Sequence, residues 1–251
     1  KVAGVPPDYF SETGQLWGNP LYDWDAIKKD NYTWWIDRVK FNLNTCDIIR
    51  IDHFRGFDSY WAVPAEDDTA INGTWEKGPG MDLFNAIKNE LGDLPIIAED
   101  LGSLTPGVIQ LREDSTFPGM KILQFAFDSG EENDYLPHTY DRNSVVYTGT
   151  HDNDTLVGWY SKAKAEDKKW VKDYLDLNDD THIHWNFIKS AWSSVANIAI
   201  APIQDFLGLG GEARINTPGV AAGNWQWRLS DDVLTDELAE KISYITRMYG
   251  R

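Results

Sequence analysis

Basic residues are scarce in this sequence relative to acidic ones. The 251 residues include 23 Lys and Arg against 40 Asp and Glu, so the formal net charge is −17. Proteins that bind nucleic acid or anionic membranes need a positive face that displaces counterions from phosphates. The charge balance therefore excludes both of these classes.

Cysteine and long apolar runs are also missing. Cys46 is the single cysteine, which rules out an intrachain disulfide and a cysteine-based metal cage. No run approaches the ~18 apolar residues of a membrane helix, and the first residues lack the apolar segment of a signal peptide. These absences predict a soluble protein of the cytoplasm, or of a plastid if the source is a plant.

Aromatic residues, in contrast, are abundant. The sequence holds 12 Trp and 11 Tyr, and 42% of its residues are hydrophobic, which is enough for a buried core. Flat rings suit the apolar faces of sugars or of nucleic-acid bases, and the acidity disfavours nucleic acid. The composition therefore favours a sugar ligand.

Short apolar runs alternate with longer amphipathic stretches, a pattern typical of βα units around a parallel sheet. We expect helices over 25–43, 82–91, 184–195 and 235–249, and one that opens at Thr105 and Pro106. Stretches 6–19 and 61–80 are expected to be long irregular loops, which are usually functional. The candidate strands are Val2–Val5, Ile48–Asp52, Ile96–Glu99, Ile122–Phe127, Val145–Gly149 and Ile198–Ile200.

The number of strands bears on the fold class. A (β/α)₈ barrel often occupies about 250 residues and has eight parallel strands. This sequence offers about six, and the first begins at residue 2 with no helix before it. We predict an α/β fold in which residues 1–251 are the C-terminal part of a catalytic (β/α)₈ TIM barrel, incomplete in this chain, with no second domain. An open six-stranded sheet is the alternative.

Acidic side chains lie at the ends of three expected strands. Asp52 ends one strand and shares a face with Arg50, Glu99 ends another, and Asp152 follows the strand over 145–149. The carboxyl ends of parallel strands meet at one edge, so the three carboxylates would converge on one mouth. Each alone is more simply a structural ion pair or hydrogen-bond acceptor, whereas three together favour catalysis.

Three carboxylates beside Arg50 and His151, with no glycine loop for phosphates, suggest cleavage of a glycosidic bond. In a retaining mechanism one carboxylate attacks the anomeric carbon, while another donates a proton and later removes one. Arg50 is expected to keep Asp52 ionised. A raised pKa is expected for Glu99, which lacks an adjacent cation and faces negative neighbours. These expectations make Asp52 the nucleophile and Glu99 the acid/base.

At these residues the sequence resembles a known family, the 4-α-glucanotransferases of glycoside hydrolase family 77, also called amylomaltases or disproportionating enzymes. The resemblance implies a (β/α)₈ barrel that transfers α-1,4-glucan segments between malto-oligosaccharide donors and acceptors, without a metal or organic cofactor. The matching segments are 4–11 with 14–20, 50–57, 98–102, 150–155, and 213–219 with 223–225.

The resemblance also implies roles for individual residues. Asp52 would be the nucleophile, Glu99 the acid/base and Asp152 the transition-state stabiliser, with Arg50 and His151 as supporting partners. The other residues expected to bind the glucan are Asp8, Tyr9, Phe10, Gln15, Trp17, His53 and Asn153.

Family members run to about twice this length, as the resemblance implies, with roughly the first half ahead of Lys1. A barrel without its first two units would expose the free edges of its first and last strands. We hypothesise that the 251 residues are either a product of truncation or a fragment that pairs with the missing N-terminal half, and that they are inactive alone.

Several alternatives stay open at this point. An α-glucan hydrolase or branching enzyme of the α-amylase group shares the Arg-x-Asp strand and the His-Asp pair, and a non-catalytic glucan-binding module would only stack sugars on aromatic rings. Segment 204–210 either lines the mouth or merely turns the chain. His182 and His184 are expected to be solvated loop histidines, because nothing nearby completes a metal site.

Overall fold

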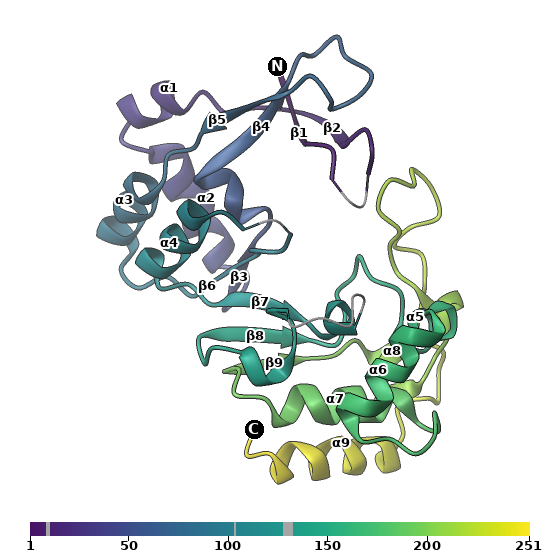
Figure 1. Ribbon diagram of the computed structural model, residues 1–251. Coiled ribbons are helices and arrows are strands. Elements are labelled where there is room, and N and C mark those ends of the chain that lie inside the picture. The colour runs from purple at the N-terminus through teal and green to yellow at the C-terminus, as the bar shows by residue number, and fades with distance from the viewer. Residues whose placement is uncertain (9–10, 103, 128–132) are drawn as a thin grey trace. The chain divides into compact units, whose positions relative to one another are not determined.

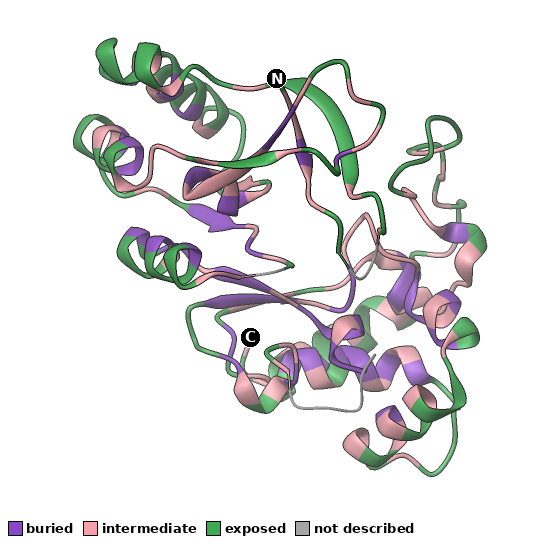
Figure 2. Cartoon of the chain, turned by 45° about the horizontal axis from the view of Figure 1, so that its top comes forward, coloured by how far each residue is buried: buried purple, intermediate pink, exposed green. Residues whose placement is uncertain are grey.

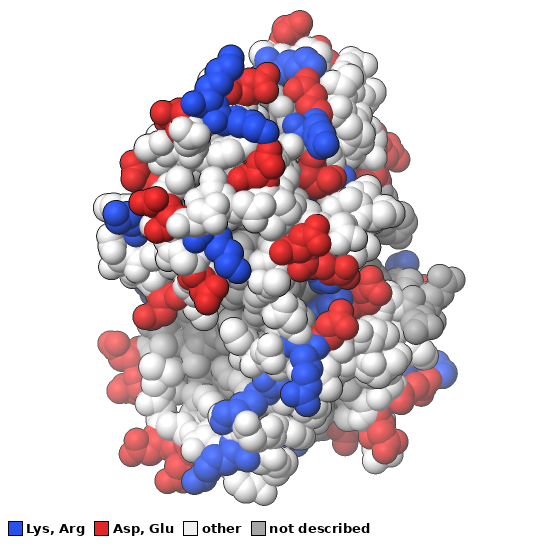
Figure 3. Space-filling view, turned by 90° about the vertical axis from the view of Figure 1, so that its left-hand side faces the viewer, with Lys and Arg blue, Asp and Glu red and all other residues white. Residues whose placement is uncertain are grey.

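The computed structural model describes residues 1–8, 11–102, 104–127 and 133–251 (Figure 1). The chain divides into two compact units, residues 1–119 and 120–251. None of the described helices is long and apolar enough to cross a membrane. On the face drawn in Figure 3, Lys and Arg side chains are interspersed with Asp and Glu side chains. The expectation that residues 1–251 belong to one barrel domain stays a prediction.

The first unit contains an antiparallel sheet that the sequence did not predict. Its strand order is β2 (Gln15–Pro20), β1 (Val2–Val5), β4 (Ser59–Val63) and β5 (Thr74–Lys77). The strand expected at 2–5 therefore exists, but it pairs antiparallel with β2 and β4 and is not a parallel barrel strand. The stretches 6–19 and 61–80, expected to be irregular loops, contribute to three strands. Strand β2 is exposed at every residue, as the green strand beside the N-terminus in Figure 2 shows, so no burial pattern marks it in the sequence.

A parallel pair of strands forms the second sheet of this unit. Strand β3 (Ile49–Ile51) pairs with β6 (Ile96–Ala98), in the register Ile49 to Ile96 and Ile51 to Ala98. All three residues of β6 are buried. Both expected strands are confirmed: β3 is one residue shorter at each end than the sequence suggested, and β6 is one residue shorter at its C-terminal end.

Helices pack against this parallel pair. They are α1 (Trp24–Lys29), α2 (Thr33–Leu43), α3 (Met81–Leu91), α4 (Pro106–Ser115) and the 3₁₀ helix η1 (Phe54–Phe57). The single helix expected over 25–43 is wrong, because Asn31 and Tyr32 adopt left-handed conformations (φ 51° and 59°) that end α1 and begin α2 afresh. The expected start of α4 is confirmed, since Thr105 Oγ1 accepts the Val108 N–H at 3.4 Å. Buried Phe54, Leu83, Ile87 and Ile96 belong to the core of the unit.

The second unit contains a sheet with the strand order β7 (Gly119–Ile122), β8 (Ser144–Tyr147) and β9 (Ile198–Ile200), of which β8 and β9 are parallel. The strand expected over 122–127 is wrong beyond its first residue. Strand β7 ends at Ile122, and Leu123–Phe127 is the 3₁₀ helix η2. Leu123, Ala126 and Phe127 are buried in this turn, and a short apolar run of this kind does not distinguish a strand from a helical turn.

Helices complete the second unit. They are α5 (Leu156–Lys162), α6 (Ala165–Leu175), α7 (Ile183–Ser193), α8 (Ile203–Leu207) and α9 (Asp236–Met248), with the 3₁₀ turns η3 (Pro137–Thr139) and η4 (Gly211–Ala213). The helices expected over 184–195 and 235–249 are confirmed within two residues. His184 is wrong as a solvated loop residue: it lies in α7, half-buried, and burial lowers its pKa to about 4.

Candidate active site

Asp52 and Glu99 lie at the carboxyl ends of neighbouring parallel strands. Ile51 of β3 pairs with Ala98 of β6, so Asp52 and Glu99 are the next residue on each strand. The pairing continues past the strand ends, because the Glu99 N–H donates to the Ile51 carbonyl at 3.0 Å. The structure thus confirms that these two acidic residues share one edge of a sheet.

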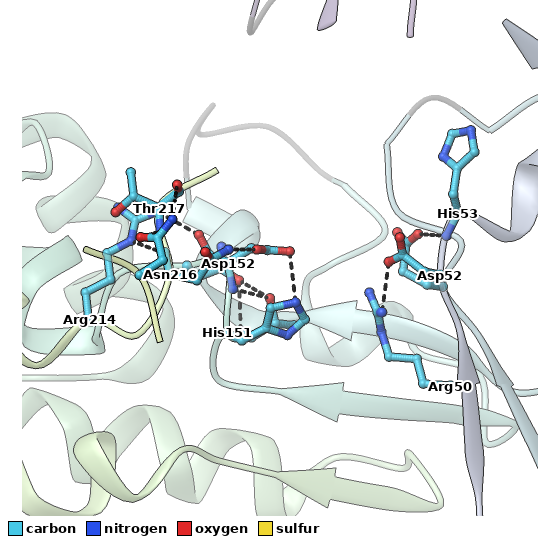
Figure 4. Close-up of polar contacts among 12 residues, drawn as sticks. Arg50, Asp52, His53, His151, Asp152, Arg214, Asn216 and Thr217 are labelled. Atoms are coloured by element: carbon cyan, nitrogen blue, oxygen red, sulfur yellow. Dashed lines mark hydrogen bonds and ion pairs between the residues drawn. The ribbon is translucent and has the colours of Figure 1, made fainter. Parts of the chain in front are cut away.

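Arg50 and Asp52 form the ion pair expected from their spacing. Arg50 Nη1 lies 2.9 Å from Asp52 Oδ1 (Figure 4). The Arg50 side chain is 26% exposed, whereas the Asp52 side chain is 80% exposed. The guanidinium therefore holds one carboxylate oxygen, while the rest of the Asp52 side chain remains accessible to an incoming molecule.

Glu99 is held by two main-chain N–H groups. The His53 N–H donates to Oε2 at 2.6 Å, and the Leu101 N–H donates to Oε1 at 3.0 Å. Burial raises the pKa of Glu99 to about 7, even though these hydrogen bonds and the Arg50 charge favour the ionised form. The direction agrees with the expectation, but the main cause is burial, and the Asp52 charge adds only a minor contribution. A carboxyl with this pKa can donate and accept a proton near neutral pH.

His53 connects the two carboxylates to strand β2. Its left-handed conformation (φ 49°) follows Asp52 directly, and its N–H donates to Glu99. The Trp17 ring meets the imidazole edge-on, with 4.7 Å between ring centroids. Trp17 Nε1 in turn donates to Gln15 Oε1 at 3.2 Å. The structure therefore brings Trp17 and His53, two residues expected to bind glucan, to one cavity with Asp52, and Gln15 contacts Trp17.

His53 is neutral in this setting. Burial, reinforced by the positive charge of Arg55, lowers its pKa to about 4. Near neutral pH the imidazole therefore contributes shape and hydrogen-bonding groups, and it adds no positive charge beside Asp52.

A cavity of about 560 Å³ opens beside Asp52 within the first unit. Arg50, Asp52 and His53 contribute polar groups to its wall. Aromatic side chains supply much of the remainder, namely Trp17, Tyr22, Trp24, Trp35, Phe57 and Tyr60. Apolar walls with a few polar groups are typical of small-molecule sites, and flat rings suit a sugar.

The expected loop residues near the N-terminus are described only in part. Asp8 Oδ1 accepts the Ser11 N–H at 2.9 Å, and the expected contact of Asp8 with glucan stays a prediction. Tyr9 and Phe10 lie outside the described residues, so their expected contact with glucan stays a prediction.

Asp152 is fixed by three neighbours within the second unit (Figure 4). His151 Nε2 lies 3.2 Å from Asp152 Oδ2, and Asn216 Nδ2 donates to Asp152 Oδ1 at 2.6 Å. Arg214 Nη2 donates to the Asp152 main-chain carbonyl at 2.7 Å. Each carboxylate oxygen thus has a polar partner, and the Asp152 side chain is still 44% exposed.

Asn153 has a structural task in this loop. Its Oδ1 accepts hydrogen bonds from the Thr150 N–H at 2.8 Å and from the Thr150 hydroxyl at 2.9 Å. These bonds close the turn that carries His151 and Asp152. Its expected contact with glucan stays a prediction.

Arg214 and Asn216 were not among the expected site residues. Their segment resembled the family, and this was the signal available in the sequence. No spacing rule connects Asn216 with a carboxylate 64 residues earlier in the chain. The convergence of Asp152 with Asp52 and Glu99 stays a prediction, since Asp152 belongs to the second unit and the other two belong to the first.

Comparisons with known proteins extend over the whole chain. A family model for the 4-alpha-glucanotransferases of glycoside hydrolase family 77 matches residues 1–235. The chain is 55% identical to a 4-alpha-glucanotransferase of Clostridium butyricum, over 100% of this chain and 52% of that protein. It is 49% identical to the chloroplastic/amyloplastic 4-alpha-glucanotransferase of Arabidopsis thaliana, over 100% of this chain and 44% of that protein.

A solved structure is also similar. It is described as an amylomaltase from Streptococcus agalactiae in complex with acarbose, and it matches with a TM-score of 0.96 and 39% identity. The match covers 100% of this chain and 51% of that chain. The chain thus spans about half the length of the proteins that it matches.

Proposed function

The chain belongs to the 4-α-glucanotransferases of glycoside hydrolase family 77, and from this premise we propose that it carries the catalytic carboxylates of an enzyme that transfers α-1,4-glucan segments between malto-oligosaccharides. The observation that carries the proposal is the pair formed by Asp52 and Glu99. Asp52 is exposed and paired with Arg50, whereas Glu99 is buried with a pKa raised to about 7. Retaining glycosidases need this difference between their two carboxyl groups.

In the proposed first step, Asp52 attacks the anomeric carbon of the donor glucan. Protonated Glu99 gives its proton to the glycosidic oxygen, so the C–O bond breaks and the leaving chain departs with a free 4-hydroxyl. In the second step Glu99 takes the proton from the 4-hydroxyl of the acceptor. The acceptor oxygen then displaces Asp52 from the anomeric carbon, which restores both carboxyl groups.

We assign supporting roles to residues around this pair. Arg50 keeps Asp52 oriented through the 2.9 Å contact. Trp17 offers an apolar face to a sugar ring, since its side chain is 43% exposed beside His53. Asp152 would grip ring hydroxyls at the transition state, with the carboxylate aligned by His151 and Asn216.

The choice between transfer and hydrolysis depends on which hydroxyl reaches the glycosyl-enzyme intermediate. Aromatic side chains in the cavity beside Asp52 would favour a sugar, because they stack on acceptor rings and displace water. Maltotriose tests this directly. Transfer yields glucose and longer chains with no net rise in reducing ends, whereas a hydrolase raises the number of reducing ends.

Two variants test the assigned roles. In the complete enzyme, Asp52→Asn should abolish transfer while malto-oligosaccharide binding persists, and an active Asp52→Asn variant would refute the role of Asp52 as nucleophile. Glu99→Gln should retain more activity with a glucosyl fluoride than with glucan, because fluoride needs little protonation to leave. Equal losses with both substrates would contradict the acid role.

We further propose that β3, β6, β8 and β9 are strands of a (β/α)₈ barrel, completed by a polypeptide that corresponds to the unmatched half of the relatives. In the described part of the first unit, β3 pairs with β6 alone, which leaves its other edge open. Ile48, the residue before β3, is 46% exposed, and Trp34 and Phe41 of α2 are 50% and 69% exposed. Large apolar side chains that are exposed favour a polypeptide partner.

Titration with the N-terminal half of the Clostridium butyricum relative tests this partner. Light scattering should detect an equimolar complex, and Ile48→Asp should weaken it, whereas Tyr244→Asp on α9 should not. Loss of binding with Tyr244→Asp alone, or no complex with the unmodified chain, would refute the proposed partner.

We also propose a cytoplasmic or plastid location, supported by the bacterial and chloroplastic relatives. Cell fractionation tests this location.

A further inference from the structure

The loop that carries Asp152 is tied at both ends to one buried carboxylate. Asp205 in α8 is 1% exposed. Its Oδ2 accepts the Thr148 hydroxyl at 2.6 Å, and its Oδ1 accepts the Leu156 N–H at 2.8 Å. Thr148 follows strand β8, and Leu156 is the first residue of α5. The two hydrogen bonds therefore close the loop 149–155 at its base.

The loop has hydrogen bonds of its own that keep its shape. Besides the turn closed by Asn153, the Asp152 N–H donates to Thr150 Oγ1 at 3.3 Å. Buried Gln124 donates through Nε2 to the Asp154 carbonyl at 2.9 Å. Because the internal turn is already fixed, the position of Asp152 relative to the sheet depends on how the base of the loop is held.

Gln204, the residue before Asp205, contacts the segment that carries the hydrogen-bond donors to Asp152. Gln204 is 3% exposed, and its Nε2 donates to the Ala213 carbonyl at 3.2 Å. Ala213 ends η4, and Arg214 follows it and donates to the Asp152 carbonyl. The short helix α8 thus contacts both the loop that bears Asp152 and the segment that bears its hydrogen-bond donors.

A carboxylate at this position is costly for folding. The Thr148 hydroxyl and the Leu156 N–H are neutral donors, and burial raises the pKa of Asp205 to about 6, with a further small rise caused by Asp154. An apolar side chain of similar volume would avoid the desolvation cost of a buried charge. The placement of Asp205 is therefore better explained by a role in the candidate active site than by a contribution to folding stability.

We propose that Asp205 is a positioning residue for Asp152, because it anchors both ends of the loop 149–155. The proposal rests on the proposed function, in which Asp152 acts on the sugar. It assigns no contact between Asp205 and the glucan.

Four variants test the anchor. Asp205→Ala removes both acceptors. Asp205→Asn is the conservative variant, because its amide oxygen can accept the Leu156 N–H while its amide nitrogen donates to the Thr148 hydroxyl. Thr148→Val removes one bond only, and it serves if Asp205→Ala does not fold. Ser144→Ala is the matched control, since it removes the 2.6 Å hydrogen bond that the buried Ser144 hydroxyl donates to the Asp141 main-chain carbonyl at the other end of β8.

Hydrogen exchange of the main-chain amides over 149–156 gives a readout that needs no activity. In the intact chain, Asp205→Ala should accelerate exchange in this segment by about 10-fold or more, and Thr148→Val by about 3-fold or more. Asp205→Asn and Ser144→Ala should leave it close to that of the unmodified chain. Unchanged exchange in Asp205→Ala and Thr148→Val would overturn the proposal.

Maltotriose transfer gives the second readout. Asp205→Ala should lower kcat by about 10- to 100-fold with a smaller change in KM. Asp205→Asn should keep most of the kcat of the unmodified chain. In an Asp152→Asn background the same change should cost less than about 3-fold, because its effect passes through Asp152. Equal losses in both backgrounds would overturn the positioning role. Transfer is measured with the chain complemented by the N-terminal half of the Clostridium butyricum relative. If the complemented, unmodified chain shows no transfer, the proposed function fails, and the exchange result alone decides whether Asp205 holds the loop.

Discussion

The main-chain N–H of His53 donates to Oε2 of Glu99 at 2.6 Å, so the residue after the proposed nucleophile holds the carboxyl group of the proposed acid/base. His53, two residues after β3, is left-handed (φ 49°), and the N–H of the next residue, Phe54, donates to the Glu99 main-chain carbonyl at 2.9 Å. The two carboxyl groups are therefore positioned by one continuous stretch of main chain.

Glu99 should make stability depend on pH. Its folded-state pKa is raised from 4.5 to about 7, so between these values the folded chain binds more protons than the unfolded chain. The free energy of unfolding must then fall as pH rises through this window. In urea titrations, the free energy of unfolding of the unmodified chain minus that of Glu99→Gln should decrease from pH 4.5 to about 7. A difference that is independent of pH would contradict the raised pKa.

The pair formed by Asp100 and Arg112 should be sensitive to loss of one partner. Arg112 Nη1 lies 3.0 Å from Asp100 Oδ2, and the two side chains are 16% and 5% exposed. Arg112→Met would leave a buried charge beside Glu99, and we expect it to lower the free energy of unfolding by about 3 to 5 kcal/mol. Lys169→Met is the control, because it breaks an exposed pair on α6 and should cost about 0.5 kcal/mol or less. Similar losses in urea titrations would refute this difference.

Trp17 should contribute to glucan binding. Its ring is 43% exposed and lies on the wall of the cavity that contains Asp52. Trp17→Ala should weaken malto-oligosaccharide binding by about 10-fold in calorimetric titrations, because a stacking surface is lost. Tyr244→Ala on α9 removes a 60% exposed ring in the other unit and should leave the affinity unchanged. Equal affinities of both variants would count against a role of Trp17.

Asn216 should determine how Asp152 is presented. Its Nδ2 donates to Asp152 Oδ1 at 2.6 Å. Asn216→Asp replaces this donor with a second carboxylate, and repulsion should displace Asp152 and lower kcat for maltotriose transfer by about 10-fold or more. Asn89→Asp adds the same charge to an exposed position of α3 and should have no effect. An active Asn216→Asp variant would show that the contact is not needed.

The sequence alone was sufficient for strands β3 and β6 and for the residues that follow them. Ile49, Ile51, Ile96 and Ile97 mark these two strands as short apolar runs, of which β6 is buried and β3 is half-buried. The polar residues at their ends, Asp52 and Glu99, stand out against that background. The capping position of Thr105 could be predicted for a similar reason, since its bond is local in the chain.

Tertiary structure decided the features that depend on partners distant in the chain. Strand β2 is exposed along its length and is defined by its hydrogen bonds to β1, so no local pattern of apolar residues predicts it. The pKa of Glu99 is set mainly by burial, which the sequence around it does not encode. Asn216 and Asp205 act on the Asp152 loop from positions about 50 to 60 residues later, and only the packing of α8 and of the following segment brings them there. Neighbouring residues are enough to predict short strands and helix caps. Desolvation and long-range hydrogen bonds exist only once the chain has folded.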